Sequence, residues 1–224
     1  ARGRGGGGGR GAAPAPPRPP GGAPLAPVTA AVTVPVTADL EDGYGADPAE
    51  VASTVTRALA AGVAGINLED GTLTPADFAT RLTAARTAAD KAGTDLFLNA
   101  RIDTYLLGLG APEHRLTETL NRAHRYVAAG AGGIFVPGVT DPATISALAA
   151  EIPVPLNVMA GPGAPSVAEL GRLGVARVSL GSGVAQAACG VAGRAARELL
   201  AGGTYDALAD AVPYPEMQGL LAAR

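Results

Sequence analysis

From about Val32 onward, short apolar segments alternate with longer segments that carry apolar residues at helical spacing. Val51, Val55 and Leu59, for example, fall at i, i+4 and i+8, which is typical of one face of a helix. A strand–helix unit repeated in series requires parallel strands joined by right-handed crossovers. The chain is therefore expected to form either a (β/α) barrel or a doubly wound sheet. The expected strands are 33–39, 64–69, 95–101, 132–136, 154–159 and 175–180.

Capping residues mark where the helices between these strands begin. Asp47 precedes Pro48, a pair that is typical of a helix N-terminus. Ser166 stands three residues before Glu169, which is the spacing of a capping box. Glycines such as Gly93 follow several of the helical segments and are expected to end them.

Polar residues within the strands distinguish the barrel from the open sheet. Side chains alternate between the two faces of a strand, so Ile66 and Leu68 facing the helices would turn Glu69 toward the barrel interior. The same rule points Val34 and Leu180 toward the helices. Active sites of such barrels lie at the C-terminal ends of the strands, and several polar residues are expected to meet there. This set is Asp39, Glu41, Glu69, Arg101 and Asn157.

The segment Asp39-Leu40-Glu41-Asp42-Gly43-Tyr44-Gly45 places two carboxylates on one strand face, followed by a glycine-rich turn. Carboxylate oxygens are the ligands of hard cations, which suggests a Mg²⁺ site. The alternative is a solvated strand end with an acidic turn. Arg101 is suited to grip a substrate carboxylate through two hydrogen bonds, or else to form an ion pair with Asp103 inside the barrel.

Composition limits the classes of partner and of compartment. The net charge of −3 argues against nucleic acid as the main partner, and no apolar run approaches the roughly 18 residues of a membrane span. A single cysteine fits a reducing cytoplasm. Cys189 lies among small residues and is expected to pack in the core, whereas His114 and His124 are expected at the surface.

Five motifs together resemble the isocitrate lyase / phosphoenolpyruvate mutase superfamily, and within it the bacterial phosphonomutase-like branch. The resemblance covers about residues 28–221. The motifs are Val-Pro-Val-Thr-Ala-Asp-Leu-Glu-Asp-Gly-Tyr-Gly at 34–45, Gly-Val-Ala-Gly-Ile-Asn-Leu-Glu-Asp at 62–70, Leu-Asn-Ala-Arg-Ile-Asp at 98–103, Gly-Ile-Phe-Val-Pro-Gly at 133–138 and Val-Ser-Leu-Gly-Ser-Gly at 178–183.

This resemblance implies a TIM-type (β/α)8 barrel whose last helix is swapped with a neighbouring subunit, usually in a homotetramer. It also implies a Mg²⁺-dependent carbon–carbon lyase or phosphonomutase acting on a small 2-oxo or hydroxy (di)carboxylate through an enolate-like pyruvate. The resemblance assigns roles to three groups of residues. The metal would be held largely through water by Asp39, Glu41 and Glu69, the catalytic residues would be Asp39, Glu69 and Arg101, and the substrate contacts would be Arg101, Asn157, Gly43, Tyr44 and Gly45.

Two features of the chain depart from the superfamily pattern. The segment 70–75 lacks the Cys- and His-containing loop of the isocitrate lyases, which argues against that activity. Only six strand–helix units are expected, because the Gly/Pro/Arg-rich residues 1–27 cannot form the first two. We interpret 1–27 as a disordered or mis-framed segment and 28–224 as the barrel domain. A barrel of six units is expected to be poorly stable alone and inactive.

Two other functions fit parts of the sequence. Glycine turns at 161–163 and 181–183 follow the last two strands, where barrels often bind phosphate, and they would fit a phosphate-binding enzyme of another family. The other reading is a non-catalytic barrel fragment that only associates with itself.

Overall fold

The computed structural model describes residues 25–222, so the expectations about residues 1–24 lie outside it. Six parallel strands form one sheet in the order in which they occur along the chain, β1 to β6. A doubly wound sheet would reverse its strand order, so this sequential order excludes it. The strands are β1 (Thr37–Asp39), β2 (Gly65–Glu69), β3 (Phe97–Arg101), β4 (Gly133–Val136), β5 (Leu156–Met159) and β6 (Arg177–Ser179).

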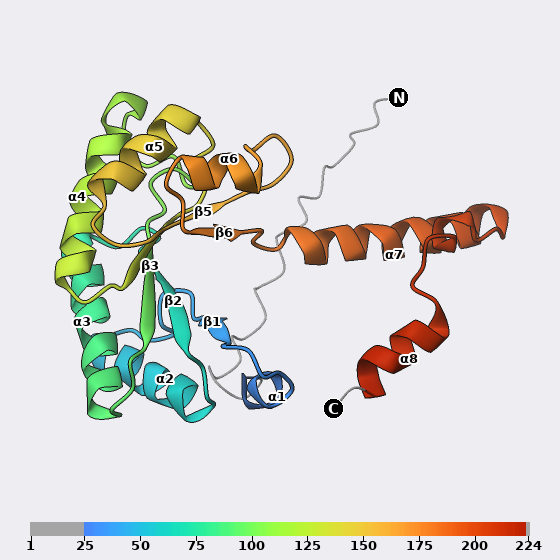
Figure 1. The fold of residues 1–224 in the computed structure, drawn as a ribbon, viewed down its shortest axis with the longest axis horizontal. Coiled ribbons are helices and arrows are strands. Elements are labelled where there is room, and N and C mark those ends of the chain that lie inside the picture. Colours follow the sequence, from blue (N-terminus) through green and yellow to red (C-terminus); the bar gives the residue numbers. More distant parts are fainter. Residues whose placement is uncertain (1–24, 223–224) are drawn as a thin grey trace, which may run out of the picture.

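The sheet curls into a half-barrel with helices on its outer side (Figure 1). The curl brings the first and last strands toward each other. Their proximity is shown by a hydrogen bond of 3.2 Å that Arg177 Nη2 of β6 donates to Thr37 Oγ1 of β1. All six expected strands are present, although each is shorter than predicted. The first is the most reduced, since β1 pairs with β2 only over Thr37–Asp39.

The helices that cover the strands begin where capping residues were expected. Asp47 accepts hydrogen bonds from two backbone amides at the start of α2, and Ser166 and Glu169 form a complete capping box at the start of α6. The outer helices are α2 (Pro48–Ala60), α3 (Pro75–Lys91), α4 (Arg115–Ala128), α5 (Pro142–Glu151) and α6 (Val167–Arg172), with α1 (Leu25–Ala30) before β1 and the 3₁₀ turn η1 (Pro112–His114) before α4.

The core lies between the sheet and these helices and is built from aliphatic residues. Ile66, Leu68, Leu98 and Ala100 are fully buried, as the alternation rule predicted. The prediction is wrong for Val34 and Leu180, which are 66 % and 55 % exposed. Both lie just outside the hydrogen-bonded strands.

The C-terminal part of the chain leaves the half-barrel. The long helix α7 (Gly183–Gly202) extends away from the sheet, and α8 (Tyr214–Ala222) follows the turn η2 (Asp206–Leu208) (Figure 1). None of the described residues of α7 is buried. Cys189 is consequently exposed rather than packed in the core, because α7 does not cover the sheet. His114 and His124 are exposed, as predicted.

No helix within residues 25–222 combines the length and the apolar character needed to cross a bilayer.

Candidate active site

Strand register places four side chains in one layer toward the C-terminal ends of the strands. Three of them, Glu69, Arg101 and Asn157, were predicted to lie there, and the fourth is Phe135. Glu69 pairs with Arg101, and Arg101 pairs with Phe135. Phe135 in turn pairs with Asn157 on β5. Each of these positions faces the inside of the half-barrel, so Glu69, Arg101 and Asn157 share the inner surface that the sequence predicted.

Arg101 is held in a fixed orientation by two carboxylates. Its Nη1 lies 2.6 Å from Glu69 Oε2, and its Nε lies 2.7 Å from Asp103 Oδ1. Its guanidinium carbon lies 6.0 Å from the centre of the Phe135 ring. A guanidinium has five N–H groups, and these two ion pairs use two of them. Among the described residues, the other three N–H groups have no ion-pair partner, and the side chain is 19 % exposed.

The environment of Glu69 disfavours its negative charge. Burial raises the pKa of Glu69 above the ordinary glutamate value, and Arg101 opposes this rise. The neighbouring carboxylates of Asp103, Asp39 and Glu41 raise the pKa further. Their effect on the pKa of Glu69 indicates that several negative charges lie near one another at this end of the half-barrel. A bound cation would reduce the repulsion between them.

Asp39 and Glu41 do not lie on the same strand, in contrast to the prediction. Strand β1 ends at Asp39, and Glu41 has a left-handed backbone with φ of 48°. The expectation that both share one strand face is therefore wrong, because alternation stops where the strand stops. The Glu41 backbone still lies beside β2, since its carbonyl accepts a hydrogen bond from Glu69 N at 2.8 Å.

The carboxylates do not form a direct metal cage. Within residues 25–222, no group of three His, Cys, Asp or Glu side chains is arranged to hold a metal ion. The Asp39 carboxylate is exposed, and its Oδ1 accepts a hydrogen bond from Glu41 N at 3.1 Å. Binding of Mg²⁺ by these carboxylates through water stays a prediction.

The Gly43-Tyr44-Gly45 turn is shaped by its contact with α2. A Cβ added to Gly43 would lie 2.8 Å from a Val51 methyl group, and one added to Gly45 would lie 2.6 Å from Glu50 Cβ. Tyr44 has a left-handed φ of 54° and packs its side chain against the core. Close packing thus accounts for both glycines, and a substrate contact at this turn stays a prediction.

Asparagines line the interior of the half-barrel. Asn99 Nδ2 donates a hydrogen bond to Asn67 Oδ1 over 2.9 Å. Asn157 is 2 % exposed, and neither of its side-chain polar atoms has a hydrogen-bond partner among the described residues. Buried polar groups are nearly always satisfied, so Asn157 indicates a water molecule or a ligand in the interior.

A buried ion pair that the sequence did not predict lies behind the site. Asp70 Oδ2 lies 2.8 Å from Arg122 Nη1 and accepts a hydrogen bond from Tyr126 Oη at 2.8 Å. Its other oxygen accepts from Asp103 N at 2.9 Å. Burial raises the pKa of Asp70, and these hydrogen bonds oppose the rise. Arg122, Tyr126 and the Asp103 amide all donate to the Asp70 oxygens, and these hydrogen bonds favour the ionised carboxylate. One signal was available: Asp70 continues the helix-facing positions of Ile66 and Leu68, where a charge needs a partner.

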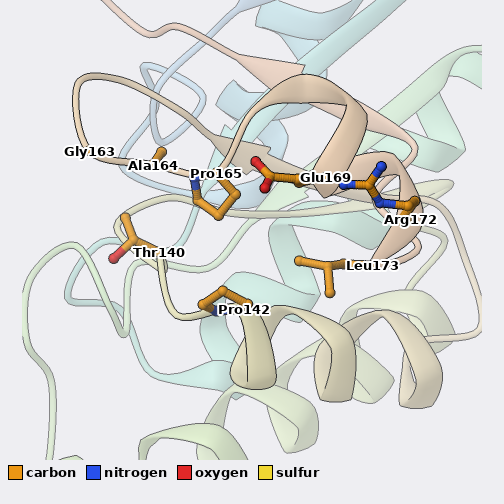
Figure 2. A pocket seen from close by; sticks show the side chains of 8 residues that line it. All are labelled: Thr140, Pro142, Gly163, Ala164, Pro165, Glu169, Arg172 and Leu173. Carbon is orange, nitrogen blue, oxygen red and sulfur yellow. The ribbon is translucent and has the colours of Figure 1, made fainter.

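A pocket of about 490 Å³ lies between the loops that follow β4 and β5. Figure 2 shows that Thr140 and Pro142 line one side of the pocket, and that Glu169 and Arg172 of α6, with Leu173 directly after the helix, line the other. None of Asp39, Glu41, Glu69, Arg101 and Asn157 lines it, whereas Gly163 of the glycine turn at 161–163 does. We place the candidate site at Arg101 rather than here, because the interior holds the converging charges and the unpaired asparagine.

Comparison with known proteins identifies the family of the chain. Residues 23–200 match the model of the phosphoenolpyruvate phosphomutase family. The uncharacterised protein Rv1998c of Mycobacterium tuberculosis is 40 % identical over 203 residues, which cover 89 % of this chain and 72 % of that protein. The oxaloacetate decarboxylase of Ectopseudomonas mendocina is 37 % identical over 150 residues, which cover 63 % of this chain and 50 % of that enzyme.

Solved structures extend the comparison to the fold. The crystal structure of a candidate lyase/mutase from Burkholderia cenocepacia J2315 superimposes with a TM-score of 0.80 at 37 % identity. The match covers 89 % of this chain and 73 % of that one. The family model, which spans most of the chain, and the strand order lead to the same conclusion: the chain belongs to the phosphoenolpyruvate phosphomutase family, within the phosphoenolpyruvate mutase/isocitrate lyase superfamily.

Proposed function

We propose that the site catalyses a Mg²⁺-dependent lyase reaction on a small 2-oxo dicarboxylate, and that oxaloacetate is the first substrate to test. The observation that carries this proposal is Arg101, which two carboxylates orient while three of its N–H groups remain available inside the half-barrel. The similarity to an oxaloacetate decarboxylase supports the choice of substrate.

Arg101 and Asn157 could bind the substrate for a decarboxylation. Arg101 would bind the carboxylate next to the 2-oxo group, and the buried amide of Asn157 would donate to a second oxygen of the substrate. In a decarboxylation, the bond between the far carboxylate and its carbon breaks, CO₂ leaves, and the electron pair remains on the enolate of pyruvate. The enolate then takes up a proton to give pyruvate.

The metal would be held by Asp39, Glu41 and Glu69 through water molecules. Mg²⁺ supplies a positive charge that lowers the energy of negative charge on the substrate oxygen. Burial is the main cause that raises the pKa of Glu69, and the neighbouring carboxylates raise it further; a cation bound here would relieve that repulsion.

The proposal is tested by pyruvate release from oxaloacetate at millimolar Mg²⁺, measured above the Mg²⁺-only blank. Asp39→Asn is expected to lower the rate about tenfold to a hundredfold, since it removes one charge from the metal site. The exposed Asp90 of α3 supplies the matched control, and Asp90→Asn should leave the rate unchanged. The same assay tests the expectation that a six-unit chain is inactive.

Other outcomes would favour the alternatives. Turnover of a 3-phosphono-2-oxo acid in place of oxaloacetate would assign the phosphonomutase form of the reaction. Binding of phosphate esters that is indifferent to Asp39→Asn would favour a phosphate-binding enzyme. Absence of any Mg²⁺-linked rise in Tm would favour a non-catalytic fragment.

The C-terminal arm, residues 183–222, suggests how subunits associate. Leu199, Leu200, Tyr214 and Leu220 are each more than half exposed, and α7 buries none of its described residues. We propose that this arm packs against a neighbouring subunit in a homo-oligomer in the cytoplasm, as the resemblance implied. Light scattering coupled to size exclusion tests this proposal: a monomer at micromolar concentration would contradict it.

A further inference from the structure

Arg81 of α3 reaches across to the loop that follows β1. The side chain is buried, and its Nη1 donates to Asp42 O at 2.9 Å and to Gly45 O at 2.8 Å. Its Nη2 donates to Ala46 O at 3.3 Å. One guanidinium therefore binds three backbone carbonyls of the turn between Glu41 and Ala46.

This turn has an unfavourable backbone conformation. Glu41 and Tyr44 have φ of 48° and 54°, in the left-handed region that residues other than glycine rarely adopt. Such conformations persist only where the surrounding structure holds them. The three carbonyls also bring partial negative charges close together, and a buried cation offsets their repulsion.

We propose that Arg81 is a positioning residue for the active site. By binding the three carbonyls it fixes the turn that carries Glu41 and leads from Asp39 to Gly45. Without it, the turn would relax toward ordinary backbone angles, and the Glu41 carboxylate would move away from Glu69. The link to ligand binding rests on the proposed function, whereas the effect on the turn does not.

Arg86 provides a matched control on the same helix. Its Nη2 donates to Leu96 O at 2.8 Å and its Nε donates to Gly130 O at 3.2 Å. Leu96 and Gly130 precede β3 and β4, so these bonds lie at the opposite end of the strands from the site. Arg81→Met and Arg86→Met each remove one guanidinium that binds backbone carbonyls, and similar losses in Tm are expected.

The experiment measures hydrogen–deuterium exchange of the segment 40–46 in the full chain. Arg81→Met should speed exchange there by about tenfold or more, since a charge-assisted hydrogen bond restrains local opening, and Arg86→Met should not. Arg81→Lys keeps the charge with fewer donors and should give an intermediate rate. If Arg81→Met fails to fold, the comparison is made with Arg81→Lys and Arg86→Lys.

The second readout is the affinity for oxalate, a stable dicarboxylate similar in shape to the enolate of pyruvate, at millimolar Mg²⁺. Arg81→Met should weaken it about tenfold and Arg86→Met less than twofold. Equal exchange at 40–46 in the two variants, or equal oxalate affinity, would overturn the positioning role. Failure of the wild-type chain to bind oxalate would overturn the proposed function, and the exchange rates would still decide whether Arg81 holds the turn.

Discussion

Replacing Arg101 by lysine is expected to lower kcat/KM for oxaloacetate by about a hundredfold to a thousandfold, a range typical of removing one donor that stabilises developing charge. The positive charge is kept, so the loss reflects geometry. A lysine has three donors on one nitrogen and cannot contact Glu69, Asp103 and a substrate carboxylate with the planar fork that Arg101 provides.

Oxalate binding separates the substrate contact from the chemistry. Arg101→Lys should weaken oxalate at millimolar Mg²⁺ about tenfold to a hundredfold, as expected for a charge-assisted hydrogen bond. Isothermal titration calorimetry measures this, with Arg86→Lys as the control outside the site. Wild-type affinity in Arg101→Lys would show that Arg101 is a structural ion pair inside the barrel, the alternative that the sequence left open.

Much of the fold could be predicted because short-range periodicity determines it. The alternation of Ile66 and Leu68 with Asn67 and Glu69 correctly gave both faces of β2, and both aliphatic residues are fully buried. Parallel strands in sequential order then bring Glu69 beside Arg101, which the register confirms. Local pattern and strand order were therefore enough to gather part of the site.

The features that could not be predicted depend on contacts between distant residues or on local backbone geometry. The left-handed φ of Glu41 interrupts the alternation that was used to place it, and no sequence period encodes such a turn. Arg81 lies 39 positions from its carbonyl partner at Asp42, and Arg122 lies 52 positions from Asp70. Small neighbouring residues likewise do not show what covers a helix, which is why Cys189 on α7 was predicted in the core but is exposed.

Asp70→Asn is expected to lower the free energy of unfolding by about 3–5 kcal/mol, the usual cost of removing one partner from a buried ion pair. The substitution keeps the shape of the side chain but removes the buried counter-ion of Arg122, whose side chain is 11 % exposed. Only the more exposed Glu118, whose Oε1 lies 2.7 Å from Arg122 Nε, then remains as a counter-ion. The new amide also places N–H donors where Arg122, Tyr126 and the Asp103 amide all donate.

Urea unfolding of the full chain measures this loss, and Asp90→Asn on the exposed side of α3 should change stability by less than about 0.5 kcal/mol.

Arg122→Met in the Asp70→Asn background provides the stricter test. Because the penalty comes from a charge that has lost its buried partner and keeps only Glu118, removing that charge should recover part of the loss. The double variant should then be more stable than the sum of the single effects predicts. Additive losses would show that Asp70 and Arg122 stabilise the barrel independently. Coupled losses would mean that the ion pair ties the ends of β2 and β3 to α4, and so holds Glu69 and Arg101 next to each other from behind the site.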